Sequence, residues 1–252
     1  MNGMEPAQKI RDAVGQVAQL RRDASGNPAL GAAVAAIKSL QTRRFAGTYA
    51  DLLGGGPYRA AAHFFLHELY GDTDYSERDA QFSRIAGALQ KLFPRQVTAT
   101  AVSLAQLHAL TERLDHAMGV AWQDGDDPDH GHAQAARYAR AWRAVARRAD
   151  RRAQLTMVLE IGGELQHVTR APGLRLMLKM MRGPAVAAGM GALQRFLEAG
   201  FDTFAAMAHQ PGGADGFMAL IEARESALID LLFDAEFVAC ETELARILGQ
   251  AR

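Results

Sequence analysis

Two histidines, His63 and His67, are four residues apart in a segment with helical periodicity, so they would share one helix face. Two imidazoles on one face can bind one metal ion. Glu164 and His167 form a Glu-x-x-His pattern, which di-iron bundles contribute from two helices. The chain has one such pattern, and its polar residues fall opposite the leucines of their helix. A metal or haem site is therefore the weakest hypothesis, and the sequence predicts no cofactor.

A second row of polar residues raises the same question. His108, Glu112 and His116 follow one another at four-residue intervals, with Asp115 beside them. They fall opposite the leucine face of their expected helix. Side chains four residues apart on a helix surface commonly form pairs in solvent. We therefore expect solvated pairs here rather than metal ligands.

Methionine and phenylalanine are concentrated between residues 157 and 207. Thioether side chains are flexible and can line an adaptable apolar pocket. The candidate lining residues are Met177, Met180, Met181, Met190 and Phe201. The simpler interpretation is that they fill the core between helices. A carrier or sensor of an apolar small molecule is therefore the second functional hypothesis.

An arginine-rich helix is expected from about residue 133 to residue 150, with Tyr138 and Trp142 between the arginines. Arginine and aromatic side chains together can bind phosphate groups or nucleic acid. However, the arginines are spread around the helix, and the formal net charge of the chain is zero. We expect them to pair with the acidic segments 45–130 and 196–252, in the fold or in a dimer. Nucleic acid is not an expected partner.

No familiar catalytic pattern is present. The single cysteine, Cys240, excludes an internal disulfide and lies among glutamates, which raise rather than lower a thiol pKa. Gly54-Gly55-Gly56 lacks the Gly-Lys-Ser/Thr of a phosphate-binding loop. The hydrolase pattern Gly-x-Ser-x-Gly is also absent. These observations favour a protein that is not an enzyme.

The start of the chain is polar and contains no apolar signal core. No run reaches the roughly 18 apolar residues needed to cross a bilayer. A lone cysteine fits a reducing compartment. The sequence therefore predicts a cytoplasmic protein without a membrane span.

Strand patterns are nearly absent, and a 3.6-residue apolar periodicity recurs along the chain. The sequence predicts an all-α fold, a single irregular bundle of roughly eight to ten helices formed by residues 1–252. The polar run at residues 123–132 is the best candidate for a sub-boundary. Helix starts are expected at Asn27-Pro28 and at Ser76.

Glycine and proline predict where the later helices end. Gly183-Pro184 is expected to separate a short methionine-rich helix from the helix that follows it. The arginine-rich helix either ends near Asp150 or continues through Leu165 and Val168 until Pro172 ends it. The last helix is expected to run from about Asp215 almost to the C-terminus.

The segment Phe64-Phe65-Leu66-His67-Glu68-Leu69-Tyr70 resembles the signature of the proteobacterial "FFLEELY motif" proteins, with His67 in place of glutamate. Shorter stretches between about residues 40 and 235 also resemble that family. The resemblance implies a bacterial cytosolic protein, and it brings no catalytic residue, substrate or cofactor. Exposed aromatic side chains beside a charged turn make good anchors for a protein partner. The candidate interaction segment comprises Phe64, His67, Glu68, Tyr70, Asp72 and Tyr75.

Three functional hypotheses follow from these patterns. The leading one is a non-enzymatic binding or adaptor protein that acts through protein–protein contacts, with a homo-oligomer as one form of such contact. The second is a carrier of an apolar ligand, and the third is a metal- or haem-binding protein.

Overall fold

A computed structural model describes residues 5–69, 75–92, 95–123 and 132–251. In these ranges the chain is all-helical and has no strand, as predicted. It forms twelve α-helices and one π-helical segment, slightly more than the eight to ten expected. The α-helices are α1 (Pro6–Gly26), α2 (Pro28–Thr48), α3 (Ala50–Gly54), α4 (Arg59–Phe64), α5 (Ser76–Leu92), α6 (Arg95–Gln123), α7 (His132–Val145), α8 (Arg148–Thr169), α9 (Leu174–Ala187), α10 (Gly191–Met207), α11 (Gly213–Asp234) and α12 (Phe237–Gln250), and the π-helical segment η1 is Phe65–Leu69.

Two predicted helix starts are confirmed. The side chain of Asn27 accepts a hydrogen bond from the backbone N–H of Leu30 at 3.2 Å, and Pro28 is the first residue of α2. An N-cap side chain satisfies one of the donors that a helix start leaves without a partner. The second start is at Ser76, where α5 begins.

Two breaks were not predicted and explain part of the larger helix count. The arginine-rich helix ends at Val145, and Ala146 adopts a φ of 51° before α8 begins. Alanine rarely adopts that conformation. The sequence has no glycine or proline at this point, so nothing in it predicted the break. The C-terminal helix is interrupted at Ala235, where Glu236 caps α12 by accepting from the N–H groups of Val238 and Ala239.

The predicted break at Gly183-Pro184 is wrong. Pro184 lies inside α9, which continues to Ala187 and ends before Gly189, whose φ is 69°. Proline removes one backbone hydrogen bond but can be accommodated near a helix end. The methionine-rich helix is consequently one turn longer than expected.

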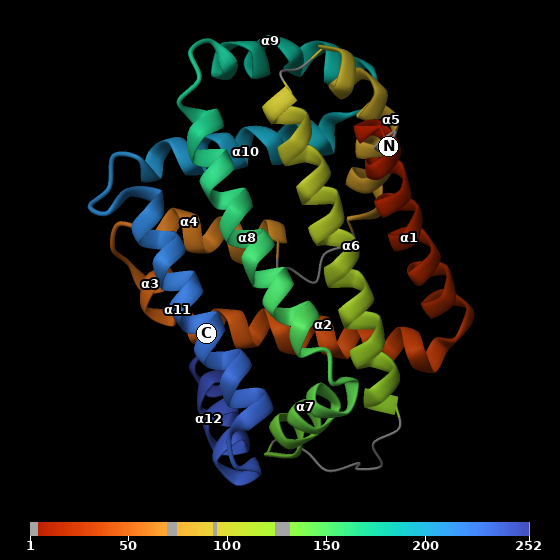
Figure 1. The fold of residues 1–252 in the computed structure, drawn as a ribbon, viewed down its shortest axis with the longest axis vertical. Coiled ribbons are helices and arrows are strands. Elements are labelled where there is room, and N and C mark those ends of the chain that lie inside the picture. The colour runs from red at the N-terminus through yellow and green to blue at the C-terminus, as the bar shows by residue number, and fades with distance from the viewer. Residues whose placement is uncertain (1–4, 70–74, 93–94, 124–131, 252) are drawn as a thin grey trace.

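Figure 1 shows α6 and α8 side by side along the long axis of the molecule. Helix α2 crosses them in the lower half, α10 crosses α8 in the upper half, and α9 lies across the upper end against α10. Most buried apolar side chains form one large cluster, and a smaller cluster joins α1, α5 and α6. The predicted sub-boundary at 123–132 falls almost entirely outside the described residues. No described helix is both long and apolar enough to cross a membrane.

Candidate functional site

The FFLEELY-like segment forms a packed joint between α4 and α5. The Phe65 ring is buried and lies edge-on to Phe217 of α11, with the ring centroids 5.2 Å apart. Phe64 is half-buried and stacks on Phe196 of α10 at 6.1 Å. Both phenylalanines therefore pack inside the molecule, which gives them a structural role in joining α4, α10 and α11.

Two backbone carbonyls of η1 are held by side chains that follow in the sequence. The Tyr75 hydroxyl donates to the carbonyl oxygen of His67 at 2.7 Å, and Arg78 donates to that of Glu68 at 3.2 Å. Carbonyls near a helix end need partners of this kind. The Arg78 guanidinium also lies 4.0 Å from the ring centroid of Tyr75 and 4.4 Å from that of Phe196. These contacts tie the described end of η1 to the start of α5 and to α10.

The candidate interaction residues are therefore divided between core and surface. His67 is exposed, whereas Glu68 and Tyr75 are half-buried. Tyr70 and Asp72 lie outside the described residues. This distribution leaves few described side chains of the segment available as anchors.

The metal candidates occupy two separate places, one at the junction of α4 and η1 and the other on α8. The rings of His63 and His67 are stacked, with centroids 5.8 Å apart. On α8, Glu164 accepts a hydrogen bond from Gln96 at 3.1 Å, and His167 is exposed near the helix end. Across the described ranges, no three His, Cys, Asp or Glu side chains form a group that could hold a metal ion.

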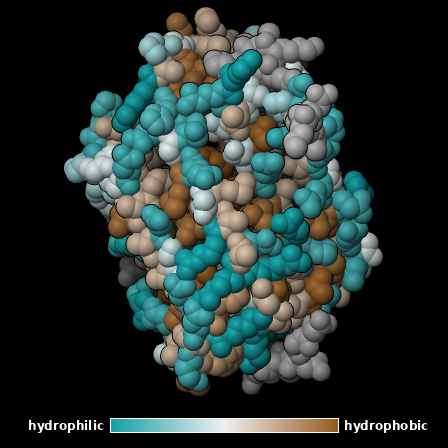
Figure 2. All heavy atoms as spheres, in the orientation of Figure 1, coloured by the Kyte–Doolittle hydropathy of each residue, from teal (hydrophilic) through white to brown (hydrophobic). Residues whose placement is uncertain are grey.

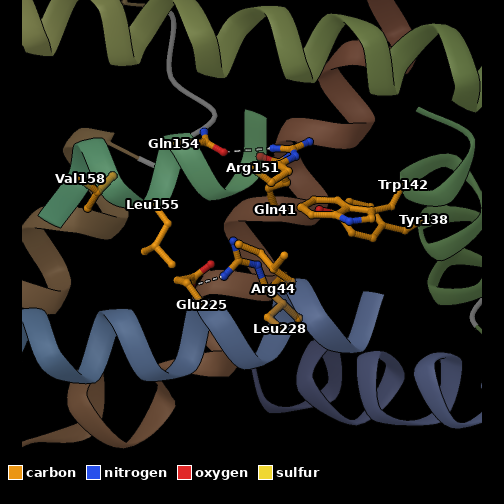
Figure 3. Close-up of a pocket in the computed structure, with 11 residues that line it drawn as sticks. Gln41, Arg44, Tyr138, Trp142, Arg151, Gln154, Leu155, Val158, Glu225 and Leu228 are labelled. Atoms are coloured by element: carbon orange, nitrogen blue, oxygen red, sulfur yellow. Dashed lines mark hydrogen bonds and ion pairs between the residues drawn. The ribbon is translucent and has the colours of Figure 1, made fainter. Parts of the chain in front are cut away.

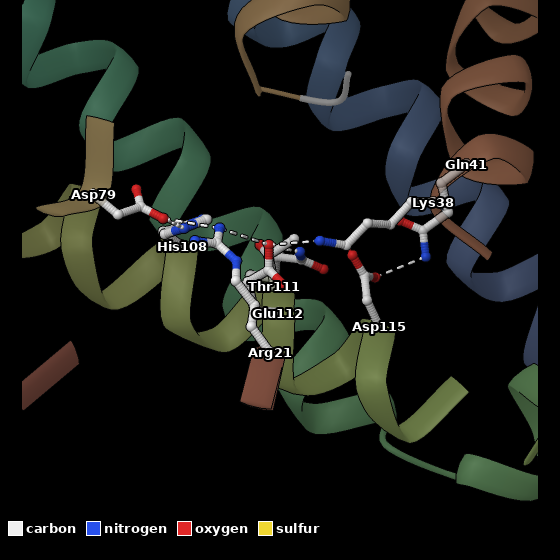
Figure 4. A network of polar contacts seen from close by, with 9 residues as sticks. Arg21, Lys38, Gln41, Asp79, His108, Thr111, Glu112 and Asp115 are labelled. Carbon is white, nitrogen blue, oxygen red and sulfur yellow. Dashed lines mark hydrogen bonds and ion pairs between the residues drawn. The ribbon is translucent and has the colours of Figure 1, made fainter. Parts of the chain in front are cut away.

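In the second row of polar residues Glu112 and Asp115 are buried and His108 and His116 are half-buried, so the prediction of solvated pairs is wrong. Figure 4 shows that it faces α1, α2 and α5. Glu112 accepts from Lys38 at 2.7 Å, and His108 lies 2.9 Å from Asp79. Arg21 of α1 lies 2.8 Å from the same Asp79 oxygen. Because α6 packs against α1, α2, α5, α7 and α8, its polar residues are covered by other helices.

Two carboxylates of this network have pKa values shifted in opposite directions. Burial acts to raise the pKa of Asp79, but the hydrogen bonds and charges of His108 and Arg21 lower it to a net value below its ordinary range. For Asp115, burial is again the largest influence, and it outweighs the nearby positive charges and the hydrogen bond from Gln41, so the pKa is raised. Asp115 accepts one hydrogen bond from Gln41, at 2.9 Å. The network is thus a set of interhelical contacts that join α1, α2, α5 and α6.

Part of the arginine-rich segment pairs with acidic residues of segment 196–252, as predicted. Arg148 pairs with Asp230 and Asp234 of α11, and Arg152 pairs with Asp230. Arg143 donates to two carbonyls at the end of α11. Through these contacts the arginines stabilise the packing of α7 and α8 against α11. Cys240 is buried, and burial raises the pKa of its thiol, which disfavours the nucleophilic thiolate.

Helix α9 has an exposed apolar surface. Four of the six large apolar side chains that are exposed in the described ranges belong to it, and we call them the α9 face: Leu176, Met180, Met181 and Val186. Leu176 and Met180 are 62% and 65% exposed. Figure 2 shows apolar atoms beside hydrophilic ones at this end of the molecule.

The predicted apolar lining residues are spread over α9 and α10. Met180 and Met181 are exposed, Met177 and Met190 are half-buried, and Phe201 is buried. Because Met180 and Met181 are exposed and the Phe201 ring is buried, these side chains do not line one enclosed pocket. Their placement is that of a surface helix over a packed core. The signal for this surface is in the sequence, because Leu176, Met180, Gly183 and Ala187 recur at helical spacing.

Basic residues lie along the same helix, and α9 itself has no acidic residue. Arg175 pairs with Asp202 of α10 at 2.9 Å, and Arg182 forms a two-pronged pair with Glu198 at 3.1 and 2.5 Å. Lys179 is exposed between them. The α9 face therefore has a basic border.

Fold and surface together define an all-α protein that presents one apolar, basic-edged helix. A sequence model described as "Domain of unknown function (DUF8198)" matches residues 20–238, so the chain belongs to that family. No curated protein and no solved structure matches the chain. The resemblance to the FFLEELY motif proteins stays a prediction.

Proposed function

We propose that this protein is a non-enzymatic binding or adaptor protein of the bacterial cytoplasm, and that it binds a protein partner through the α9 face. The observation that carries the proposal is the concentration of exposed large apolar side chains on this one helix. Leu176 and Met180, one helical turn apart, form the exposed row of this surface, and exposed apolar surface commonly marks an interaction site. The surface differs from the segment predicted from sequence, because Phe64 and Phe65 pack inside the molecule.

The partner that fits best is an amphipathic helix with one acidic edge. Leu176 and Met180 continue along the helix into Gly183 and Ala187, all of them exposed, so a second helix could approach closely at that end. Lys179 borders this row between Arg175 and Arg182, which pair with acidic residues of α10, and an acidic side chain on the partner would complement the lysine. Helices of this type bind by placing residues at i, i+3, i+4 and i+7 against an apolar surface.

The first experiment crosslinks the partner from two positions. A benzoylphenylalanine crosslinker replaces Met180 of the α9 face in one strain and Val238 of α12 in the other. Val238 is a matched control because it is a large apolar residue with 63% exposure on a distant helix. We expect one protein to be crosslinked at position 180 and not at position 238.

The second experiment measures the affinity of that crosslinked protein after purification. The double variant Leu176→Glu, Met180→Glu should weaken binding by at least roughly tenfold, because it places two carboxylates in an apolar contact. Val238→Glu should leave the affinity unchanged. Lys179→Glu should reduce the association rate and its dependence on salt. Equal crosslinking at both positions would reject the α9 face, and crosslinking to a second copy would replace the partner with a homodimer.

A further inference from the structure

Two methionines of α9 are the accessible thioethers in the described part of the chain. Met180 is 65% exposed and Met181 is 39% exposed. Helix α9 lies across one end of the molecule (Figure 1), and both side chains are open to small solutes there. The other described methionines are half-buried at Met157, Met177 and Met190, or at most 8% exposed at Met118, Met207 and Met218.

Other side chains that oxidants attack readily are protected. Cys240 is buried, and burial raises the pKa of its thiol, so the reactive thiolate is disfavoured. Trp122 and Trp142 are 8% and 6% exposed. Oxidation of a sulfur side chain depends on its access to solvent and, for cysteine, on its thiolate character. A mild oxidant should therefore react with Met180 and Met181 before it reaches these groups.

A hydroperoxide is the class of oxidant that converts a thioether to a sulfoxide. The sulfur attacks one oxygen of the hydroperoxide, the O–O bond breaks, and a sulfur–oxygen bond forms. The proton of the transferred hydroxyl passes to the second oxygen, which leaves as water or as an alcohol. Sulfur loses two electrons and the peroxide gains them. The methionine sulfoxide is polar, whereas the thioether is apolar, and two methionine sulfoxide reductases, one for each epimer, reverse the change.

The place of Met180 on the α9 face makes this change important for binding and not for folding. Met180 follows Leu176 by one helical turn, so a sulfoxide there puts a polar group into the exposed apolar row. Met181 adds a second polar group beside it. Neither methionine belongs to the buried apolar clusters, whereas Met118 does. Oxidation at Met118 would disrupt the core, but oxidation on α9 leaves the core as it is.

We propose that Met180 and Met181 form an oxidation site, at which a hydroperoxide produces methionine sulfoxide and reversibly blocks the α9 face as a binding surface. This inference rests on the proposed function, because it assigns a mode of regulation to the same surface. Free protein is the form that becomes oxidised, since a bound partner would cover Met180.

The first test maps the oxidation by mass spectrometry of peptides after treatment of the folded protein with hydrogen peroxide. Met180 and Met181 should be oxidised at least about tenfold faster than Met118, Met207 and Met218, which are internal controls in the same sample. At the dose that modifies the α9 pair, the melting temperature should stay within about 2 °C of its starting value. Oxidation of α9 no faster than that of the buried methionines would overturn the proposal.

The second test measures the affinity for the protein that is crosslinked at position 180, before and after peroxide treatment. Oxidation of the wild type should weaken binding by at least roughly tenfold, and the two reductases should restore it. The variant Met180→Leu, Met181→Leu keeps apolar side chains of similar volume and has no sulfur on this face. Its affinity should be the same before and after peroxide. Met157→Leu on α8 is the matched control and should respond as the wild type does.

A third measurement separates failure of this inference from failure of the proposed function. Retention of the folded protein on a phenyl column reports exposed apolar surface without any partner. Peroxide should shorten the retention of the wild type and of Met157→Leu, but not that of Met180→Leu, Met181→Leu. If no partner is crosslinked, the proposed function fails, and this shift still supports oxidation as a switch of the surface. An unchanged retention, or an equal peroxide effect in the double leucine variant, would overturn the inference.

Discussion

Replacing Asp79 with asparagine should lower the free energy of unfolding by about 2 kcal/mol at pH 7. Asp79 is buried and contacts Arg21 at 2.8 Å and His108 at 2.9 Å. A hydrogen bond to a charged group contributes about 1.5–3 kcal/mol, and the lower end applies because both partners are partly exposed. Two such contacts give about 3 kcal/mol, and the amide oxygen of asparagine recovers about 1 kcal/mol. For a chain of this size the melting temperature should fall by about 4–8 °C.

The effect should depend on pH in a defined direction. The pKa of Asp79 is lower in the folded protein than its ordinary value of about 4. A carboxyl with a lowered folded pKa stabilises the protein above its unfolded pKa, and that contribution disappears as the pH falls through the folded pKa. The difference between wild type and Asp79→Asn should therefore be present above about pH 5 and shrink below about pH 4.

Asp115→Asn is the matched control, because it makes the same chemical change in the same network. Burial raises the pKa of Asp115, so its ionised form is disfavoured in the folded protein. Its contribution has the opposite sign, and it becomes more favourable as the pH falls toward the folded pKa. Asparagine can still accept the hydrogen bond from Gln41. We therefore expect Asp115→Asn to retain or increase stability at pH 7.

The assay is urea denaturation of the wild type and both variants at about pH 7 and pH 4, with unchanged m-values as the test of two-state behaviour. The refuting result is an equal loss of stability for both variants at pH 7. That result would mean that charge does not distinguish the two carboxylates and that the opposite pKa shifts have no energetic consequence.

Three backbone predictions can be checked by the same denaturation assay. Gly47→Ala should destabilise the protein by about 2–3 kcal/mol, because its Cβ would lie 1.9 Å from the carbonyl oxygen of Ile247 where α2 meets α12; a neutral result would contradict that close approach. Gly15→Ala is its control in α1, where the Cβ would meet nothing within 4 Å, and it should stabilise by about 1 kcal/mol through helix propensity. Ala146→Gly should stabilise by about 1 kcal/mol because it relieves a left-handed backbone conformation, and a loss of stability would show that the alanine methyl group contributes more than the strain costs.

Local chemistry made the helix starts predictable from sequence. Asn27 and Pro28 form a cap through groups that are neighbours in the chain, so no tertiary information is needed. The break at Ala146 has no such signal, because alanine is a strong helix former and rarely adopts a left-handed backbone conformation. Tertiary packing therefore decided the features that the sequence did not reveal.

The candidate sites also combine features that local sequence predicts with features that depend on tertiary packing. The row of His108, Glu112 and Asp115 was correctly placed on one helix face, but its environment depends on Arg21 and Lys38, which are more than 70 residues away in the chain. Helical periodicity shows which residues share a face of the helix, but it does not show which other helices cover that face. A small cavity between α2, α7, α8 and α11 (Figure 3) was invisible for the same reason, since its polar lining comes from these four helices.

The exposed apolar side chains of α9 should contribute little to the free energy of folding. A surface helix needs one apolar side to pack against the core, and α9 has this side, where Ala185 is buried. Leu176 and Met180 form a second apolar side that gains nothing from folding while it faces water. The variant Leu176→Glu, Met180→Glu should consequently keep its free energy of unfolding within about 0.5 kcal/mol of wild type. A loss above about 2 kcal/mol would show that another part of this chain covers the face in solution, and the face would then belong to the fold rather than to a partner.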